Sequence, residues 1–383
     1  MKRQKICIIG GGLTGLVTAI SLSKLNCEID LVAESVNQKA KSGRTIAISE
    51  NNFDFLNKLN ISKFFKKKIW FCSTMKLYTK IENEKFTEIF ELNNNEKLKK
   101  ILYIVENSKM LKLMMSKIKQ IKSISIKSHK RICEINTSGS LKSIKFDNNN
   151  YKYNLIIICT GRNSSLVKNI FKNQIIENSY KETSITTILH HDSIKNNAAR
   201  QFFLDNGILA LLPISNTRTS IVWSVKKKDM YEKNDLLIKR KIKFYAKKYL
   251  KNITFATKIE YENLNLLIRN KYYQDRTLLF GDALHTVHPF VGQGFNMTLR
   301  DLKCLEKMLN KKINLGLDIG SLDMLSEFSS ETKPRNFVFS VGVDLLKNSF
   351  SYKKIRNNIM KILNKSNFAK DILFNIADKG FKF

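Results

Sequence analysis

The chain has 383 residues and a formal net charge of +34, because 67 lysines and arginines face only 33 acidic residues. This length suits about two domains, and no apolar run approaches the roughly 18 residues that a membrane-spanning helix needs. The basic residues are spread along the whole chain without a nucleic-acid module or an aromatic platform. We therefore expect no nucleic-acid partner. A solvated basic surface is the first interpretation of the charge, and attachment to acidic lipid headgroups is the second.

The cysteines and the N-terminus indicate a reducing compartment. The N-terminal apolar stretch is short, rich in glycine and unlike a signal peptide. The six cysteines are scattered and form no C-x-x-C pair, so free thiols in the cytoplasm are the simplest interpretation. These cysteines are Cys7, Cys27, Cys72, Cys133, Cys159 and Cys304.

The segment from Lys5 to Gly15 predicts a buried strand, a glycine turn and a helix. Its glycines fit the pattern G-x-G-x-x-G at Gly10, Gly12 and Gly15. In this pattern the first glycine permits a tight turn, the second lets a pyrophosphate approach the backbone, and the third lets the helix pack closely on the strand. A helix over Leu16–Leu25 and a strand over Glu28–Ala33 follow. That strand ends at Glu34, about 20 residues past the glycines, where an acid that binds ribose hydroxyls is expected. This order of elements predicts dinucleotide binding.

Apolar periodicity predicts the elements that follow. Tyr153–Cys159 is almost wholly apolar, which is typical of a strand buried on both faces, and Thr277–Phe280 is another such strand. Further strands are expected within 70–90, 123–146 and 183–265. The expected helices are Asn51–Leu59, Ser108–Ile118, Asp235–Leu250, Asn296–Leu309 and most of the tail to Phe383.

The signals for nucleotide binding occur at the start of the chain, near 155–165 and near 281–300. The predicted fold class is therefore α/β, with a discontinuous Rossmann-like domain, an inserted and mainly antiparallel β-sheet domain, and a helical C-terminal tail. We expect the cofactor domain to comprise 1–69, 100–178 and 270–383, including the tail. The substrate-binding sheet domain would comprise 70–99 and 179–269.

The segment from Arg276 to Asp301 is the richest in residues that could bind a ligand. Its first strand delivers Asp282 at the carboxyl end, where ligands bind in open parallel sheets. Pro289 then turns the chain, and Gly292 and Gly294 open a helix whose N-terminus would point at an anion.

His285 and His288 of this segment stand three residues apart. No carboxylate at ligand spacing completes a metal site, so we expect no metal. We place both histidines in the loop before the helix, where His288 is either structural or part of the active site.

Four segments taken together resemble the UbiH/UbiF/COQ6 family of FAD-dependent aromatic hydroxylases of ubiquinone biosynthesis. The segments are Gly10–Gly15, Arg44–Ile48, Tyr103–Asn107 and Gly281–Asp301. The resemblance spans the chain, and its last segment is the most specific. It implies the p-hydroxybenzoate hydroxylase fold, with FAD as cofactor and NAD(P)H as reductant. It also implies that O₂ adds at C4a of the reduced flavin and that a hydroxyl group then passes to a phenol ring.

The resemblance also implies roles for particular residues. Glu34 would bind the adenosine ribose, Arg44 would lie near the pyrophosphate, and Asp282 would hold the ribityl chain. The implied cofactor-binding residues are Gly10, Gly12, Gly15, Glu34, Arg44, Gly161, Asp282, Gly292, Gln293, Gly294 and Asn296. The implied catalytic residues beside the flavin are Pro289, His288 and Gly292.

One position departs from the family, whose pattern after the middle strand is A-D-G-x-x-S. Thr160 replaces the acid, while Gly161, Asn163 and Ser164 match. A threonine can form a hydrogen bond but supplies no negative charge. Three functions therefore stay open. The chain hydroxylates a polyprenyl phenol or benzoquinol precursor of ubiquinone, or hydroxylates a small soluble aromatic, or serves as a non-catalytic assembly subunit.

Two further segments keep two interpretations each. Glu106–Asn107 is either a helix cap or a cofactor contact. The tail from Val343 to Phe383 mixes apolar residues with lysines, which suits a helix packed on the domain or an interfacial helix on anionic lipid. With a polyprenylated substrate, we expect a cytoplasmic protein that is peripheral at the inner face of the membrane and joins a ubiquinone-biosynthesis complex.

Overall fold

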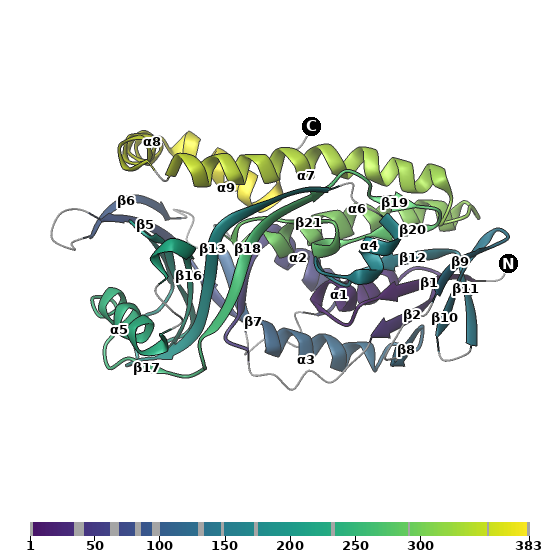
Figure 1. Cartoon of the computed structure of the whole chain (residues 1–383), viewed down its shortest axis with the longest axis horizontal. Helices are drawn as coiled ribbons and strands as arrows, with labels where there is room; N and C mark the ends of the chain where they lie inside the picture. Colours follow the sequence, from purple (N-terminus) through teal and green to yellow (C-terminus); the bar gives the residue numbers. More distant parts are fainter. Residues whose placement is uncertain are drawn as a thin grey trace.

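A parallel sheet and a larger, mainly antiparallel sheet form the two lobes of the protein, and C-terminal helices cross over both (Figure 1). This computed structural model describes residues 3–33, 42–61, 69–80, 86–93, 100–128, 134–146, 149–171, 175–230, 234–289, 292–350 and 352–380. The predicted α/β fold class is confirmed. Glu34 lies outside the described residues, so its predicted role stays a prediction.

The six-stranded sheet has the order β19-β20-β12-β1-β2-β8, and its strands are parallel except at the β19 edge. Ile6 and Ile8 of β1 and every residue from Leu155 to Ile158 are fully buried, as predicted for strands covered on both faces. The strands are β1 (Gln4–Ile9), β2 (Cys27–Ala33), β8 (Ile124–Ser128), β12 (Leu155–Ile158), β19 (Tyr273–Gln274) and β20 (Thr277–Leu279).

Helix α1 (Leu13–Leu22) joins β1 to β2 and packs on the sheet. It begins at Leu13 rather than at the predicted Leu16, because Gly12 already occupies the N-cap position. It ends at Leu22 rather than Leu25. The glycine turn therefore leads directly into the helix, so the first backbone N–H groups of the helix lie at the turn.

The nine-stranded sheet is built around the 16-residue strand β13 (Ile175–His190), which pairs with both β16 and β18. Helix α5 (Asp235–Ala246) packs Ile238 and Ile242 onto one face of this sheet, in a core that includes Trp223 and Phe202. The remaining strands are β5 (Thr74–Lys80), β6 (Phe86–Asn93), β14 (Ala198–Leu204), β15 (Gly207–Ser215), β16 (Arg218–Lys226), β17 (Thr254–Phe255), β18 (Glu260–Arg269) and β21 (His285–Thr286).

Two small sheets complete the β-structure that is described. One has the order β3-β7-β4 and the other β11-β10-β9. Their strands are β3 (Thr45–Ser49), β4 (Trp70–Cys72), β7 (Leu102–Glu106), β9 (Glu134–Ser138), β10 (Leu141–Phe146) and β11 (Asn149–Tyr153). The remaining helices before the C-terminal region are α2 (Glu50–Lys58), α3 (Asn107–Ile118) and α4 (Ser165–Phe171).

The C-terminal region is helical, as predicted, with α6 (Gly294–Asn314), α7 (Leu322–Phe350), α8 (Lys353–Lys365) and α9 (Asn367–Lys379). Helix α7 runs along the top of both lobes in Figure 1. Helix α8 packs Met360 against Leu77 of β5 and Phe90 of β6. Among the described residues, no helix is long and apolar enough to cross a membrane. The discontinuous division of the chain into a cofactor domain and a sheet domain remains our prediction.

Candidate functional site

The glycine turn after β1 leaves one open position at the start of α1. Gly10 has a φ of +125°, and a Cβ atom there would lie 2.5 Å from the carbonyl oxygen of Cys159. A Cβ atom on Gly15 would lie 1.9 Å from the Gly10 carbonyl oxygen. By contrast, a Cβ atom on Gly12 would meet no described atom within 4 Å, and no side chain caps the helix. Close packing thus requires Gly10 and Gly15 to be glycines. Gly12 instead faces free space at a helix N-terminus, and such a position favours a bound anion.

The turn after β12 lies beside this glycine turn. Gly10 approaches both Cys159 and the backbone nitrogen of Thr160. The Thr160 hydroxyl is buried and has no hydrogen-bond partner among the described residues. Gly161 has a φ of +81° and open space beside it. The segment that departs from the family pattern therefore presents an unused polar atom to the same end of the sheet.

Asp282 reaches this end of the sheet from β20. It lies in the 3-10 helix Gly281–Ala283, whose Gly281 packs against the side chain of Thr14. The Asp282 side chain is exposed to solvent. Even so, the protein around it raises the pKa of its carboxyl, while His285 and Arg162 act in the opposite direction. The rise comes from desolvation by the surrounding protein, which disfavours the charged carboxylate.

The N-terminus of α6 is held in place by Asn296, whose side chain is completely buried. Its Oδ1 accepts from the Ser49 backbone N–H at 3.0 Å and from the Asn52 amide at 3.1 Å. Its Nδ2 donates to the carbonyls of Ala47 at 2.9 Å and Gly292 at 3.2 Å. Because the protein engages the whole amide, Asn296 fixes β3 and the start of α6 rather than offering a free group to a ligand.

The other predicted residues at the start of α6 differ in exposure. Gly292 has a φ of +65°, and a Cβ atom on it would lie 3.0 Å from the Ala47 side chain. Gly294 faces open space. Gln293 is the N-cap residue, is 2% exposed and makes no capping hydrogen bond with its side chain. The backbone N–H groups at this helix end are therefore accessible beside Gly294.

Arg44 points toward the nine-stranded sheet. Its guanidinium lies 3.4 Å from Glu260 and 3.0 Å from Glu262, both on β18. Its predicted contact with a pyrophosphate stays a prediction. Glu106 is likewise engaged by the protein, because both of its carboxylate oxygens accept from Arg218 of β16, at 2.7 and 3.1 Å. The buried Oδ1 of Asn107 has no hydrogen-bond partner among the residues that the structure describes. Of the two residues, Asn107 is therefore the one with a group left for a ligand.

The two histidines before α6 have different acidic partners, and His285 lies in strand β21 rather than in the predicted loop. We call the described residues 287–289 and 292 the flavin-side loop, because the cofactor is expected beside them. His285 Nε2 lies 2.9 Å from Asp301 Oδ2, and His288 Nε2 lies 2.8 Å from Glu182 Oε2. Both imidazoles are 1% exposed. The described part of the chain contains no group of three or more histidine, cysteine or acidic residues arranged to hold a metal.

A cavity of about 290 Å³ separates this loop from the nine-stranded sheet, and Pro289 and Gly292 form part of its lining. The opposite wall mixes apolar and polar side chains, and its polar members are Ser184, Thr186, Arg200, Gln201, Ser224 and Glu262. Gln201 is 6% exposed, and its Nε2 atom has no hydrogen-bond partner among the described residues. The apolar wall includes Ala199, Ile208, Ala210, Leu212, Val222 and Leu264. This cavity can hold an apolar ring and offer it one amide group.

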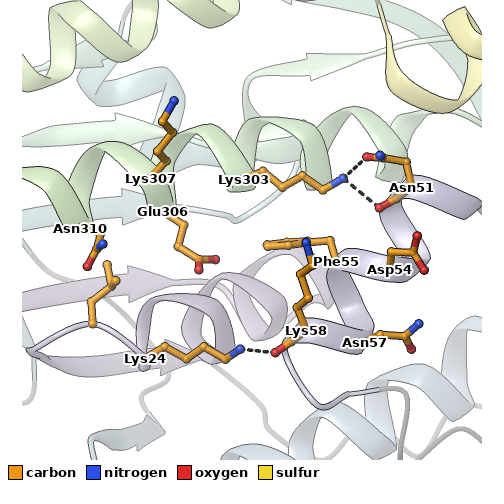
Figure 2. A pocket seen from close by; sticks show the side chains of 11 residues that line it. Lys24, Asn51, Asp54, Phe55, Asn57, Lys58, Lys303, Glu306, Lys307 and Asn310 are labelled. Carbon is orange, nitrogen blue, oxygen red and sulfur yellow. Dashed lines mark hydrogen bonds between the residues drawn. The ribbon is translucent and has the colours of Figure 1, made fainter.

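A larger cavity of about 860 Å³ lies between the end of α1, α2 and α6. Two of its lysines bond to backbone carbonyls of α2: Lys303 donates to the Asn51 carbonyl at 3.1 Å, and Lys24 donates to the Lys58 carbonyl (Figure 2). Burial lowers the pKa of Lys303 to about 8. None of the predicted site residues lines this cavity, so we do not assign it to the cofactor.

Sequence reasoning missed Glu182, Lys347 and Gln201. Gln201 could have been found, because its strand places a polar residue between Ala199 and Phe203 on an otherwise apolar face. Glu182 and Lys347 gave no local signal. They meet only because β13 and α7, which are far apart in sequence, pack together.

Comparisons with known proteins agree with this geometry. Residues 3–335 match the profile of a family described as "FAD binding domain". COQ6, a ubiquinone biosynthesis monooxygenase of Dictyostelium discoideum, is 24% identical over an alignment of 448 positions that covers 97% of this chain and 88% of the relative. The ubiquinone hydroxylase UbiL of Rhodospirillum rubrum is 25% identical over 65% of this chain and 59% of its own.

Two solved structures share the fold. The p-nitrophenol 4-monooxygenase PnpA of Pseudomonas putida superposes with a TM-score of 0.81 at 13% identity, covering 100% of this chain and 99% of its own. HpxO of Klebsiella pneumoniae, solved with FAD bound, gives a TM-score of 0.78 at 14% identity and covers 98% of each chain. At these identities the likeness concerns the fold alone.

Proposed function

The chain belongs to the FAD-binding monooxygenase family, and from this premise we propose that it hydroxylates the aromatic ring of a polyprenyl phenol or benzoquinol intermediate of ubiquinone biosynthesis. The observation that carries the proposal is the 290 Å³ cavity between the nine-stranded sheet and the loop with Pro289 and Gly292, whose lining combines apolar and polar side chains. Its volume is near the lower limit of small-molecule sites, about 300 Å³. It therefore suits the ring of the substrate, with the polyprenyl chain outside. The names of the COQ6 and UbiL relatives support this substrate class.

The residues around the sheet ends fit FAD. The open face of Gly12 and the uncapped start of α1 would receive the pyrophosphate. The exposed Asp282 carboxylate would accept from the ribityl hydroxyls, and the unpartnered Thr160 hydroxyl lies where a further hydrogen bond is available. The start of α6 beside Gly294 would face the flavin ring, where a helix N-terminus stabilises negative charge. NAD(P)H is the proposed reductant.

When bound, FAD supplies the chemistry of the reaction, which uses O₂ and electrons from NAD(P)H to add a hydroxyl group to the ring. The protein orients the ring, and the apolar side chains of the cavity wall, such as Ile208, Leu212 and Leu264, would exclude water from its faces. Pro289 and Gly292 form the part of the cavity wall that belongs to the flavin-side loop. The Gln201 amide can form a hydrogen bond with a ring oxygen and so fix which carbon faces this loop.

We also propose a cytoplasmic location with peripheral attachment to the inner face of the membrane. The proposed partners are a ubiquinone-biosynthesis complex and anionic lipid. The net charge of +34 supports attraction to acidic headgroups. Several large apolar side chains on the C-terminal helices are exposed, namely Leu345, Tyr352, Ile362, Phe368 and Ile372. Such residues between lysines suit an interfacial surface.

One alternative function has an observation in its favour. Thr160 replaces the acid of the family pattern, which favours a non-catalytic assembly subunit that keeps the fold and FAD. Anaerobic mixing with NADH or NADPH in the presence of candidate phenols separates the two functions. Rapid bleaching of the flavin, and oxygen-dependent hydroxylation of a prenylated phenol but not of its unprenylated analogue, would support the proposed enzyme. No bleaching under any condition would favour the subunit, and equal use of the unprenylated analogue would favour a small soluble aromatic substrate.

A further inference from the structure

A bulge in β13 turns two side chains toward the flavin-side loop. The pairing of β13 with β18 shifts register between Ser179 and Glu182, and Lys181 adopts a φ of +52°. Bulges re-aim side chains next to functional sites. Here Tyr180 lies edge-on to the His288 ring, with centroids 5.0 Å apart, and Glu182 bonds to the same histidine.

Glu182 is buried and joins the loop to the C-terminal helix. One oxygen lies 2.8 Å from His288 Nε2, and the other lies 2.8 Å from Lys347 Nζ of α7. The Glu182 and His288 side chains are 7% and 1% exposed, and that of Lys347 is 10% exposed. Removing either partner would leave part of the buried charge uncompensated, which destabilises the folded protein.

The charges in this group favour an ionised acid beside a neutral histidine. Burial alone would raise the pKa of Glu182, but the hydrogen bonds from His288 and Lys347 outweigh it and hold the pKa below its ordinary value. Burial lowers the pKa of His288, although Glu182 acts in the opposite direction. The full positive charge that balances Glu182 therefore comes from Lys347.

This charge state determines the tautomer of His288. An ionised carboxylate only accepts hydrogen bonds, so His288 Nε2 must carry the proton that bonds to Glu182. Nδ1 is then an acceptor, and it is buried without a hydrogen-bond partner among the described residues. Among the described residues, the other titratable groups facing His288 are Tyr180 of β13 and Asp344 of α7. Burial raises the pKa of Tyr180, and the negative charge of Asp344 raises it further.

We propose that Glu182 and Lys347 are positioning residues: their buried charge pair keeps His288 as the neutral Nε2–H imidazole and ties the loop of Pro289 and Gly292 to helix α7. Val287 and Pro289, on either side of His288, both line the 290 Å³ cavity. The pair thus connects a helix outside the cavity to the wall that the substrate ring would face. The catalytic consequence rests on the proposed function, whereas the charge state of His288 does not.

The charge state can be measured by NMR on FAD-loaded protein labelled with ¹⁵N-histidine. The chain has only five histidines, and the variant His288→Gln assigns the signal. We expect the wild-type His288 to be mainly the neutral Nε2–H tautomer at its ordinary pKa of 6.5 and above, because the protein lowers its pKa. Lys347→Met should raise the pKa of His288 by about one unit or more, because the negative charge of Glu182 is then uncompensated.

Two further variants separate charge balance from a general structural effect. Glu182→Gln should lower the pKa of His288, opposite to Lys347→Met, and the double variant E182Q/K347M should lie near wild type. Lys333→Met removes an exposed lysine of the same helix and should change nothing. A protonated or Nδ1–H His288 in the wild type would overturn the proposal, as would an unshifted His288 signal in Lys347→Met. If Lys347→Met alone does not fold, the double variant and Glu182→Gln still test the predicted direction of the pKa shift of His288.

Activity then tests the consequence for the loop. In Lys347→Met, turnover with the prenylated phenol should fall about tenfold near neutral pH and recover at higher pH, where His288 is again neutral, while FAD affinity stays unchanged. A loss that is equal at all pH values would overturn the positioning role. The NMR experiment uses no substrate, so a wrong substrate assignment would leave its result intact.

Discussion

Gly281 lies directly against Thr14, and a Cβ atom on Gly281 would come within 2.5 Å of the Thr14 Cγ2 atom. This contact joins the turn after β20 to the first turn of α1. The close approach of Gly10 to Cys159 joins the turn after β12 to the same place. Three segments separated by more than a hundred residues therefore meet at one end of the parallel sheet, which is where ligands bind in such folds.

Gly12→Val should remove FAD binding without unfolding the protein. The backbone at Gly12 has an ordinary φ of −77°, and no described atom lies within 4 Å of an added Cβ atom. We expect FAD affinity to fall at least about 100-fold, which corresponds to ~2.8 kcal/mol. Titration followed by flavin fluorescence measures the affinity, and circular dichroism checks the fold. Gly15→Val is the matched contrast, because it should disrupt folding itself. Wild-type FAD affinity in Gly12→Val would refute the placement of the pyrophosphate.

Asn296→Ala should lower the free energy of unfolding by about 3 kcal/mol, because four buried backbone and amide groups lose their partner. Urea unfolding of the protein prepared without FAD measures the effect directly. Asn310→Ala, at an exposed position of the same helix, provides the control. A loss below about 0.5 kcal/mol would mean that Asn296 does not hold β3 to α6.

Gln201→Leu should raise the stability of the protein and lower its catalytic efficiency. The buried Nε2 atom has no partner within the described part of the chain, so its removal should raise the free energy of unfolding by about 1 kcal/mol. The same change should lower kcat/KM for the phenol about tenfold if the amide binds a ring oxygen. Thermal unfolding and steady-state kinetics together test this pairing of effects. Lower stability with unchanged kinetics would assign Gln201 to the fold.

Stability should fall as the pH is lowered, in two steps. The folded protein lowers the pKa of His288 below its ordinary 6.5, so the unfolded chain binds more protons and stability is lost as pH falls through 6.5. The pKa of Glu182 is also lowered, so its contribution is present above its ordinary 4.5 and is lost as pH falls toward the folded value. Each step is worth up to about 1.4 kcal/mol per pH unit.

Urea unfolding across this pH range separates the two groups. His288→Gln should flatten the dependence at and below pH 6.5, and Glu182→Gln should flatten it at lower pH. A dependence in His288→Gln that matches the wild type would contradict the lowered pKa of the histidine.

The sequence predicted the parallel sheet well, because local patterns carry that information. Strands buried on both faces give continuous apolar runs, such as Leu155–Ile158, and a glycine turn has a fixed spacing. The start of α1 was wrong by three residues, since the glycine at its N-cap was counted as part of the turn. The antiparallel sheet was predicted as a region but not in its order, because strand pairing over long separations leaves no local pattern.

The three segments that meet at the end of the parallel sheet were singled out from the sequence, but their side-chain contacts were not, and the roles of the site residues stay predictions. Gly10, Gly12 and Asp282 stand in motifs whose backbone geometry follows from spacing. The partners of Arg44 lie on β18, that of His288 lies on β13, and Lys347 of α7 reaches the histidine only through Glu182. A bulge near Lys181 decides which side chains reach the loop. Such choices depend on tertiary packing, so no window of the sequence reveals them.

The visible absorption spectrum of the purified protein tests the central claim most directly. If the three segments hold one cofactor, the protein should show the bands of an oxidised flavin at one FAD per chain, and Asp282→Ala should lose most of that FAD during gel filtration. A colourless wild-type protein that FAD does not saturate, although it is folded, would contradict the account.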